Sequence, residues 1–414
     1  MRWLAMFGMV LAGAVGLLLA AAPEANPEPP HKGFAVHEWG VFSVTHDAAY
    51  ANADRRAELE ELPKFMYGQM ATRELPKHFV PRRVRKPVVF FHAPGPLTVE
   101  FRVAFAEGLP LVWWPATETP SIDDGAGLQP ANAPPARELF WRLYLDKPPY
   151  QVGRPAELKE VGTGHWVKAL REVKCANVFV EVGQRGVELE REQFVYYDGL
   201  IPRGKGAAIT VEKDRVSLTN EAKHPLYDVT VIDRRTPDKP RVARVAKLDA
   251  GAKQDADLTD AGDSRWPEKA ARTLQDQLKD AGLNDDEAKS LVVVWKGEFF
   301  EADGVTLFYR LPQEEYERLL PATITPRPEK LVRVGLMHHI HCEPDLAERV
   351  AKLVKQLDDD DFNKREAAQK ELARLGRGAF PHLKKLRPTL FAPEVQRRVD
   401  ELLEKHDVER AVRK

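Results

Sequence analysis

The sequence has few of the features that most directly indicate a function. Of its 414 residues only 2 are cysteines, Cys175 and Cys342, and a chain of this length can fold without a disulfide framework. One long-range bridge and two separate thiols are both compatible with the sequence. The chain also lacks a Gly-x-Ser-x-Gly element, a phosphate-binding loop and the His-Glu-x-x-His pattern of zinc proteases. Three common enzyme classes are therefore without their usual motif.

An excess of charge of one sign is also missing. Lys and Arg number 62 and Asp and Glu number 63, which gives a formal net charge of -1. Because binding to nucleic acids and anionic membranes rests on cationic surfaces, this balance argues against a nucleic-acid partner. With 43% hydrophobic and 30% charged residues, the composition is that of a globular protein with two or three folded units.

The first feature that is present is an export signal. Arg2 is followed by an uncharged run at 3–22. A positive charge ahead of a long apolar stretch predicts a signal peptide over residues 1–22. Pro23 is unfavourable just after the small-residue cleavage site, and the run is also long enough to remain as a membrane anchor. A proline-rich linker follows at 23–32. We expect an extracytoplasmic protein, in the periplasm or cell envelope or secreted, either released or tethered through residues 3–22.

The body, residues 33–342, is predicted to be mostly β-structure. Residues 98–105 and 139–145 alternate between apolar and polar side chains, which is typical of half-buried strands. Shorter β-branched or aromatic runs predict further strands at 88–91, 178–182, 194–197, 208–211 and 229–232. Many short strands separated by turn residues favour an antiparallel β-sandwich.

Part of this body resembles the immunoglobulin-like modules of bacterial envelope proteins. The resemblance covers residues 207–260 and rests on a strand that ends at Asn220, followed by the strand that begins Leu226-Tyr227-Asp228-Val229. It implies an Ig-like sandwich segment within the body.

A few helices interrupt the β-structure. Apolar spacing predicts one helix over 267–281, stopped by Gly282. Asn284 with Glu287 three residues later forms a capping box, which predicts the start of a second helix that runs to about Phe299. A short helix at 313–320 and a final strand at 331–341 complete the body. The fold class expected is α+β.

The last segment, 343–414, has helical periodicity throughout and predicts four short helices. It resembles HEAT-like repeats through the run at 357–362, the residues Arg365-Glu366-Ala367-Ala368 and the pair Leu375-Gly376. Phe362 is expected on the buried stripe of the second helix. HEAT-like repeats are helix pairs that stack, and about two pairs are few for independent stability. The resemblance therefore implies a helical tail that packs against the body or against an envelope protein partner.

Most of the body also resembles a family of uncharacterised exported bacterial proteins with a His-Glu-Trp-Gly motif. The resemblance spans most of residues 33–336. It is carried by Val36-His37-Glu38-Trp39-Gly40-Val41-Phe42, Lys86-Pro87-Val88-Val89-Phe90-Phe91-His92, Trp113-Trp114-Pro115 and residues 319–326. It implies kinship and export, and brings no known activity.

Histidines gather near the end of the body, in the run Met337-His338-His339-Ile340-His341-Cys342. On a strand, His339 and His341 share one face, and two imidazoles can share a transition metal. The family resemblance does not extend to these histidines, and no remote ligands accompany them. An exposed edge strand with chance histidines is therefore favoured, and no cofactor is then expected.

The residues His37, Glu38 and Trp39, together with His92, are candidates for a binding surface or a family motif. A His beside a Glu suggests an acid/base pair. On a strand, however, adjacent side chains face opposite sides, so His37 and Glu38 would not act on one proton. A structural role is favoured, with Trp39 in the core and a polar neighbour bonded to backbone.

Trp113 and Trp114 could form a stacking platform for a sugar ring. Alternation along a strand turns only one of the two indoles inward. The other would lie at a domain seam or in solvent, although core packing of both is the favoured interpretation.

Three functions follow from these patterns. The favoured one is a non-enzymatic envelope protein that binds other proteins through its HEAT-like tail. The second is a metal-dependent hydrolase that uses His339 and His341, with His37 or His92 brought near by the fold. The third is a carbohydrate-binding module that acts through Trp113 or Trp114.

Overall fold

The computed structural model describes residues 29–412 except 46–61, 69–81, 106–107, 119–136, 151–155, 183–187, 343–344, 376–377 and the single positions 203, 213, 237, 263, 303 and 341. The predicted signal peptide and most of the linker lie outside the described residues. Within the described part of the chain, no helix is both long and apolar enough to cross a membrane.

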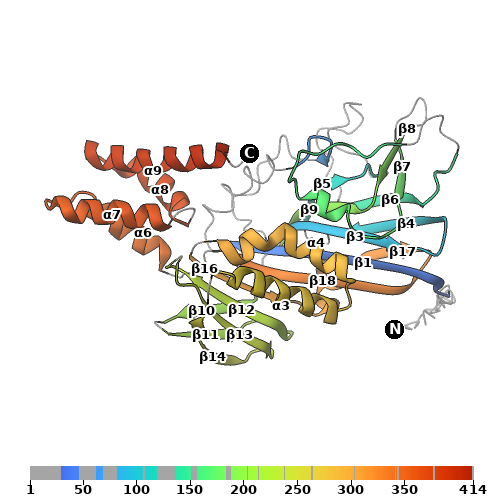
Figure 1. Cartoon of the computed structure of the whole chain (residues 1–414), viewed down its shortest axis with the longest axis horizontal. Coiled ribbons are helices and arrows are strands. Elements are labelled where there is room, and N and C mark those ends of the chain that lie inside the picture. The colour runs from blue at the N-terminus through green and yellow to red at the C-terminus, as the bar shows by residue number, and fades with distance from the viewer. Residues whose placement is uncertain are drawn as a thin grey trace, which may run out of the picture.

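A ten-stranded sheet runs through the middle of the body (Figure 1). Its central neighbours β18 and β1 pair in parallel, whereas the other pairs are antiparallel. In spatial order the strands are β15 (Thr259–Asp260), β13 (Arg241–Leu248), β12 (Leu226–Arg234), β16 (Gly304–Arg310), β18 (Pro328–Ile340), β1 (His31–Thr45), β3 (Arg82–His92), β9 (Val195–Ile201), β5 (Leu109–Trp114) and β2 (Tyr67–Gly68).

Two smaller antiparallel sheets share a hydrophobic core with one face of the large sheet. The five-stranded sheet has the order β17 (Ala322–Thr325), β4 (Leu97–Ala104), β6 (Glu138–Leu145), β7 (Val178–Val182) and β8 (Glu188–Glu192). The three-stranded sheet has the order β10 (Ala207–Val211), β11 (Arg215–Asn220) and β14 (Lys253–Asp257). Sheets therefore pack on sheets on this side, which we call the sheet side.

Helices cover the opposite face of the large sheet, which we call the helix side (Figure 1). They are α2 (Val167–Leu170), α3 (Trp266–Asp280), α4 (Asp285–Lys296) and the π-helix η1 (Gly297–Glu301). Along β1 the side chains alternate: Trp39 and Val41 belong to the helix-side core, whereas Val36 and Phe42 belong to the sheet-side core. The helix α5 (Gln313–Leu319) contributes Tyr316 to the sheet-side core.

The α+β class and the mostly antiparallel sheets are confirmed. Residues 98–105 and 139–145 form the neighbouring strands β4 and β6, and the helix predicted at 267–281 is α3. The capping box of Asn284 and Glu287 begins α4 as expected. Residues 207–260 divide between two sheets, with β10, β11 and β14 in the small sheet and β12, β13 and β15 at the end of the large one.

One prediction about the last strand of the body is wrong. The histidine-rich strand was expected at an exposed edge, but β18 lies between β16 and β1. It is covered on both faces because the helices and the small sheets pack on either side of it. Its apolar residues fit this central position, since Val332 and Val334 belong to the helix-side core and Met337 to the sheet-side core.

The tail forms the four predicted helices (Figure 1), and it has a hydrophobic core of its own. They are α6 (Leu346–Gln356), α7 (Phe362–Leu375), α8 (Phe380–Leu386) and α9 (Pro393–Val412). The expectation that Phe362 lies inward is wrong, because its side chain is 58% exposed. The buried stripe of α7 runs through Ala368 and Leu372, and at helical spacing it traces back through Arg365 rather than Phe362.

Candidate functional site

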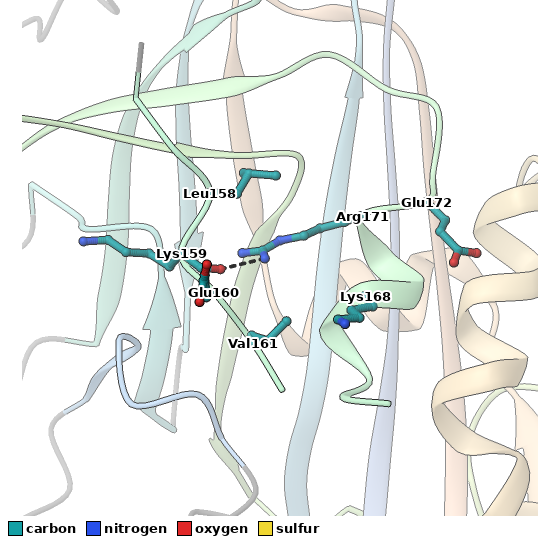
Figure 2. A pocket seen from close by; sticks show the side chains of 7 residues that line it. All are labelled: Leu158, Lys159, Glu160, Val161, Lys168, Arg171 and Glu172. Carbon is teal, nitrogen blue, oxygen red and sulfur yellow. Dashed lines mark hydrogen bonds between the residues drawn. The ribbon is translucent and has the colours of Figure 1, made fainter. Parts of the chain in front are cut away.

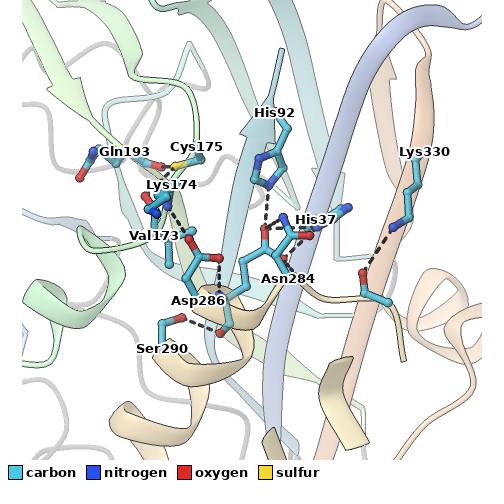
Figure 3. A network of polar contacts seen from close by, with 12 residues as sticks. His37, His92, Val173, Lys174, Cys175, Gln193, Asn284, Asp286, Ser290 and Lys330 are labelled. Atoms are coloured by element: carbon cyan, nitrogen blue, oxygen red, sulfur yellow. Dashed lines mark hydrogen bonds and ion pairs between the residues drawn. The ribbon is translucent and has the colours of Figure 1, made fainter. Parts of the chain in front are cut away.

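Among the residues that the structure describes, one group of three metal-ligating side chains converges. Nitrogen atoms of His37 and His92 and a carboxylate oxygen of Glu287 all lie within 4.8 Å of one another. Figure 3 shows His92 and His37 approaching the start of α4 from two strands of the large sheet. The sequence separates His37 from Glu287 by 250 positions. We call this group the His37–His92–Glu287 site.

Strand pairing brings the two histidines together. In the antiparallel pair of β1 and β3, Ala35 lies opposite His92 and His37 lies opposite Phe90. His37 and His92 are therefore diagonal neighbours on one face, within reach of each other, and their ring centroids are 5.0 Å apart. That face is the helix side, where α4 packs.

Capping brings the carboxylate to the histidines. Glu287 is the third residue of α4, and the Asn284 backbone N–H donates to its Oε2 at 2.7 Å. The same carboxylate bonds Nδ1 of His37 at 2.9 Å and Nε2 of His92 at 2.7 Å. Glu287 therefore caps the helix and ties it to the sheet at once.

The site is closed on one side and partly open on the other. The Glu287 side chain is fully buried and the His37 side chain is 3% exposed, whereas the His92 side chain is 22% exposed. Burial raises the pKa of Glu287, but hydrogen bonds from His37 and His92 outweigh it and lower the pKa to about 2. The carboxylate is thus a fixed anion in contact with two imidazoles.

The hydrogen bonds also fix which nitrogens carry protons. A carboxylate only accepts, so His37 Nδ1 and His92 Nε2 are the donors in this arrangement. The other nitrogen of His37, Nε2, is buried and has no hydrogen-bond partner. A neutral His37 ring therefore keeps an unused lone pair at Nε2.

The chemistry of this donor set suits a transition metal. Two imidazole nitrogens and one carboxylate oxygen are ligands of zinc-class ions and leave a fourth position open. The present nitrogen–oxygen distances are those of hydrogen bonds, whereas ligands on a tetrahedral ion with bonds of about 2.0–2.1 Å lie about 3.3 Å apart. An ion would need each nitrogen–oxygen contact to open by about half an ångström, and it would need the two imidazole nitrogens, which are within 4.8 Å of each other, to lie about 3.3 Å apart.

The cysteine nearest to this site is not arranged as a ligand. The Cys175 thiol donates to the Gln193 carbonyl at 2.9 Å (Figure 3). Burial raises the pKa of Cys175 to about 12, and the nearby Glu287 and Asp286 add to the shift. Cys342 is buried in the sheet-side core, on the opposite face of the large sheet. Both cysteines are free thiols, so they do not form the bridge that the sequence left open.

Glu38 belongs to a separate hydrogen-bond network on the sheet side. Its carboxylate accepts from Arg333 Nε at 2.7 Å, from the Tyr316 hydroxyl at 2.7 Å and from the Tyr197 hydroxyl. All four side chains are buried. His37 and Glu38 therefore face opposite sides, as alternation predicts, and do not act on one proton.

Each residue of the motif His-Glu-Trp-Gly has its own structural role in this arrangement. His37 reaches the site, Glu38 anchors the buried network, and Trp39 fills the helix-side core. At Gly40 any Cβ would lie 2.8 Å from the hydroxyl of Tyr316. Glycine is therefore required for Tyr316 to reach Glu38.

The predicted metal ligand His339 does not join this site. His339 is 3% exposed and its Nε2 lies 3.2 Å from the Tyr309 hydroxyl. It pairs with Val44 of β1 and Leu307 of β16, both of which belong to the sheet-side core. His37 and His92 are on the helix side, so the sheet separates them from His339. His341 lies outside the described residues.

The two tryptophans offer no stacking platform. Trp113 is 2% exposed and Trp114 is fully buried. Trp113 belongs to the sheet-side core and Trp114 to the helix-side core, where its Nε1 donates to Glu192 at 3.0 Å. Core packing on both faces, the favoured interpretation, is what the structure has.

Sequence reasoning identified His37 and His92 but missed Glu287 as their partner. The available signal was the capping box, which indicates where Glu287 lies along the helix and not what it contacts. Known protein-family models do not match this chain, and neither do the curated proteins.

Proposed function

We propose that this protein binds a divalent transition metal ion of the zinc class through His37, His92 and Glu287. The observation that carries the proposal is the convergence of three ligand atoms within 4.8 Å, from two strands and a helix far apart in the sequence. The uncharged run at 3–22 supports an extracytoplasmic location for this activity. The kinship with the exported His-Glu-Trp-Gly family remains part of the same proposal.

The ion would have an open position. Three protein ligands leave a fourth place for water, as in catalytic zinc sites. His92 is the partly exposed ligand, so water or a substrate would approach from its side. A metal-dependent hydrolase is therefore still a candidate, with Glu287 and His92 in place of His339 and His341.

The His37 ring limits the affinity. If Nδ1 binds an ion, the ring proton must sit on Nε2, which is buried and has no acceptor. A buried donor without a partner costs about 1–3 kcal/mol. We therefore expect an affinity below that of sites in which every ligating histidine has a carboxylate or carbonyl behind it.

A titration of the untagged protein with zinc tests the proposal. We expect about one equivalent to bind, and Glu287→Gln to weaken binding about 100-fold or more, since changes around ligands alone cost 10–100-fold. Glutamine can still serve in a capping box, so this variant keeps the start of α4.

His224→Asn is the matched control. His224 lies 3.5 Å from Glu315 and belongs to no group of three metal-ligating side chains among the residues that the structure describes, so its loss should leave zinc binding unchanged. Absence of saturable binding, or equal binding by Glu287→Gln and wild type, would contradict the proposal.

A second candidate is the protein-binding role of the tail. Two aromatic side chains on it face solvent, Phe362 at 58% and Phe391 at 91% exposed, and aromatic side chains are enriched at protein–protein interfaces. The resemblance to HEAT-like repeats points the same way. If the tail binds an envelope protein, Phe391→Ser should reduce co-purification of that protein with the full chain, whereas the exposed Lys384→Gln should not.

A further inference from the structure

A surface pocket lies apart from the His37–His92–Glu287 site and shares no residue with it. Its volume is about 500 Å³, and it is lined by residues 158–161 together with Lys168, Arg171 and Glu172. Figure 2 shows the Arg171 side chain reaching from the end of α2 across to residues 159–160. Pockets of about 300–1,000 Å³ are of the size that holds small ligands.

The guanidinium of Arg171 is fixed before any ligand arrives. Its Nε and Nη2 donate to Glu192 at 3.0 and 2.6 Å, and its Nη1 donates to the Lys159 carbonyl at 2.7 Å. Glu192 is fully buried and is held in turn by the indole of Trp114. Each terminal nitrogen of Arg171 has a second N–H that these bonds do not use.

The remaining lining groups differ in chemistry. Lys168, on α2 one turn before Arg171, and Lys159 are exposed and supply two further cations, and Glu172 supplies an exposed carboxylate beside Arg171. The Glu160 carboxylate can accept from hydroxyl groups, and Leu158 and Val161 are partly buried apolar side chains. Lys168 and Glu160 make no ion pair with the residues that the structure describes.

We propose that this pocket binds a carboxylated sugar of monosaccharide size. The two N–H groups of Arg171 that Glu192 and the Lys159 carbonyl leave unused, together with the Lys168 ammonium, can donate to a carboxylate, because cationic donors and carboxylates form strong charge-assisted hydrogen bonds. Glu160 matches the ring hydroxyls, and Leu158 and Val161 match the apolar face of the ring. The pocket thus takes the sugar-binding role that the sequence suggested for Trp113 and Trp114, which are buried.

Calorimetric titration of the full chain with D-glucuronate, and with D-glucose as the neutral counterpart, tests this proposal. We expect saturable binding of glucuronate and at least about tenfold weaker binding of glucose, because a charge-assisted bond contributes about 1.5–3 kcal/mol. Lys168→Gln should weaken glucuronate binding about tenfold, by the same reasoning. Lys253→Gln, an exposed lysine on β14, should leave it unchanged.

Three results would each overturn the proposal. They are equal affinity for glucose and glucuronate, unchanged glucuronate binding by Lys168→Gln, and lack of saturable binding of either sugar. Because Lys168 is exposed, Lys168→Gln should unfold in urea at the same midpoint as wild type, and this measurement reports separately on whether the variant is folded.

Discussion

At the scale of single residues, two neighbours in the chain take part in different contacts. His37 and Glu38 lie on opposite faces of β1, where one meets a helix and the other a buried network of Arg333, Tyr197 and Tyr316. The Arg333 guanidinium lies 4.4 Å from the ring of Tyr316 and also donates to the Leu320 carbonyl at 2.7 Å. Glu38 is the only carboxylate in this network as described, so it alone balances the Arg333 charge.

We expect Glu38→Gln to destabilise the protein strongly. Removing one partner of a buried ion pair leaves an uncompensated charge and costs about 3–5 kcal/mol. Urea unfolding measures the change. The control is Glu138→Gln, which removes an exposed partner of Arg102 and should change stability by about 0.5 kcal/mol or less. Similar losses for the two variants would contradict the importance assigned to the Glu38 network.

The sequence predicts that His37 and Glu38 occupy opposite faces of the strand, but it does not predict which side chains Glu38 contacts in this network. Alternation predicts that His37 and Glu38 diverge, and it predicts nothing about what each one meets. Arg333 lies opposite Glu38 because β1 and β18 pair in parallel, and 295 positions separate the two residues. Such long-range pairing has no local signal.

At the scale of elements, α4 is held to the sheet near both ends. Glu287 bonds the two histidines near its start. In the π-helix that continues α4, Glu298 accepts a two-pronged contact from Arg85 of β3, at 2.5 and 2.9 Å. The Arg85 guanidinium also lies 4.5 Å from the ring of Trp295.

The acid sensitivity of this second anchor can be predicted. Burial raises the pKa of Glu298, but the Arg85 charge outweighs it and lowers the pKa from 4.5 to about 2. A carboxyl group whose pKa is lower in the folded state than in the unfolded state stabilises the fold at pH values above its unfolded pKa. That contribution to the free energy of unfolding is lost as the pH falls through the folded-state pKa. The free energy of unfolding should therefore be higher for wild type than for Glu298→Gln, and this difference should be largest above about pH 4.5. The difference should disappear as the pH falls toward 2.

Urea unfolding of both proteins between pH 7 and pH 2 checks this expectation. A gap that stays constant across this range would show that the Arg85 contact does not depend on the ionised carboxylate. Glu268→Gln, which removes a surface contact to Lys296, is a useful comparison for exposed pairs, which contribute little.

The elements differ in how far their sequence predicts them. The helix α3 and the start of α4 follow from apolar spacing and a capping box, which are local patterns. The change from α-helix to π-helix after Lys296 has no such pattern, and the sequence predicted one continuous helix to about Phe299. The central place of β18 depends on what packs on its two faces, which only the assembled fold determines.

At the scale of the whole molecule, the described body and tail have separate hydrophobic cores. The tail core includes Val350, Leu372 and Val399 and contains no residue from the sheets. The sequence predicted four helices but expected them to need the body or a partner for burial. In the structure, α6 to α9 bury apolar residues against one another.

Removal of residues 344–414 should therefore leave the body folded. We expect the shortened chain to keep the unfolding midpoint of the body transition in urea, with loss of helical circular dichroism only in proportion to the missing helices. If the remaining chain aggregates or loses its near-ultraviolet signal, the two cores depend on each other and this description of the molecule is wrong.

The most direct test of the metal proposal is X-ray absorption spectroscopy of the zinc-loaded protein at the zinc edge. The account predicts a first shell of nitrogen and oxygen at about 2.0–2.1 Å with outer scattering from two imidazole rings, and no sulfur at about 2.3 Å. In Glu287→Gln at the same zinc concentration, the scattering from imidazole should fall, because binding is weakened. Sulfur scattering from Cys175 or Cys342, or a spectrum of hydrated zinc without imidazole, would contradict the account.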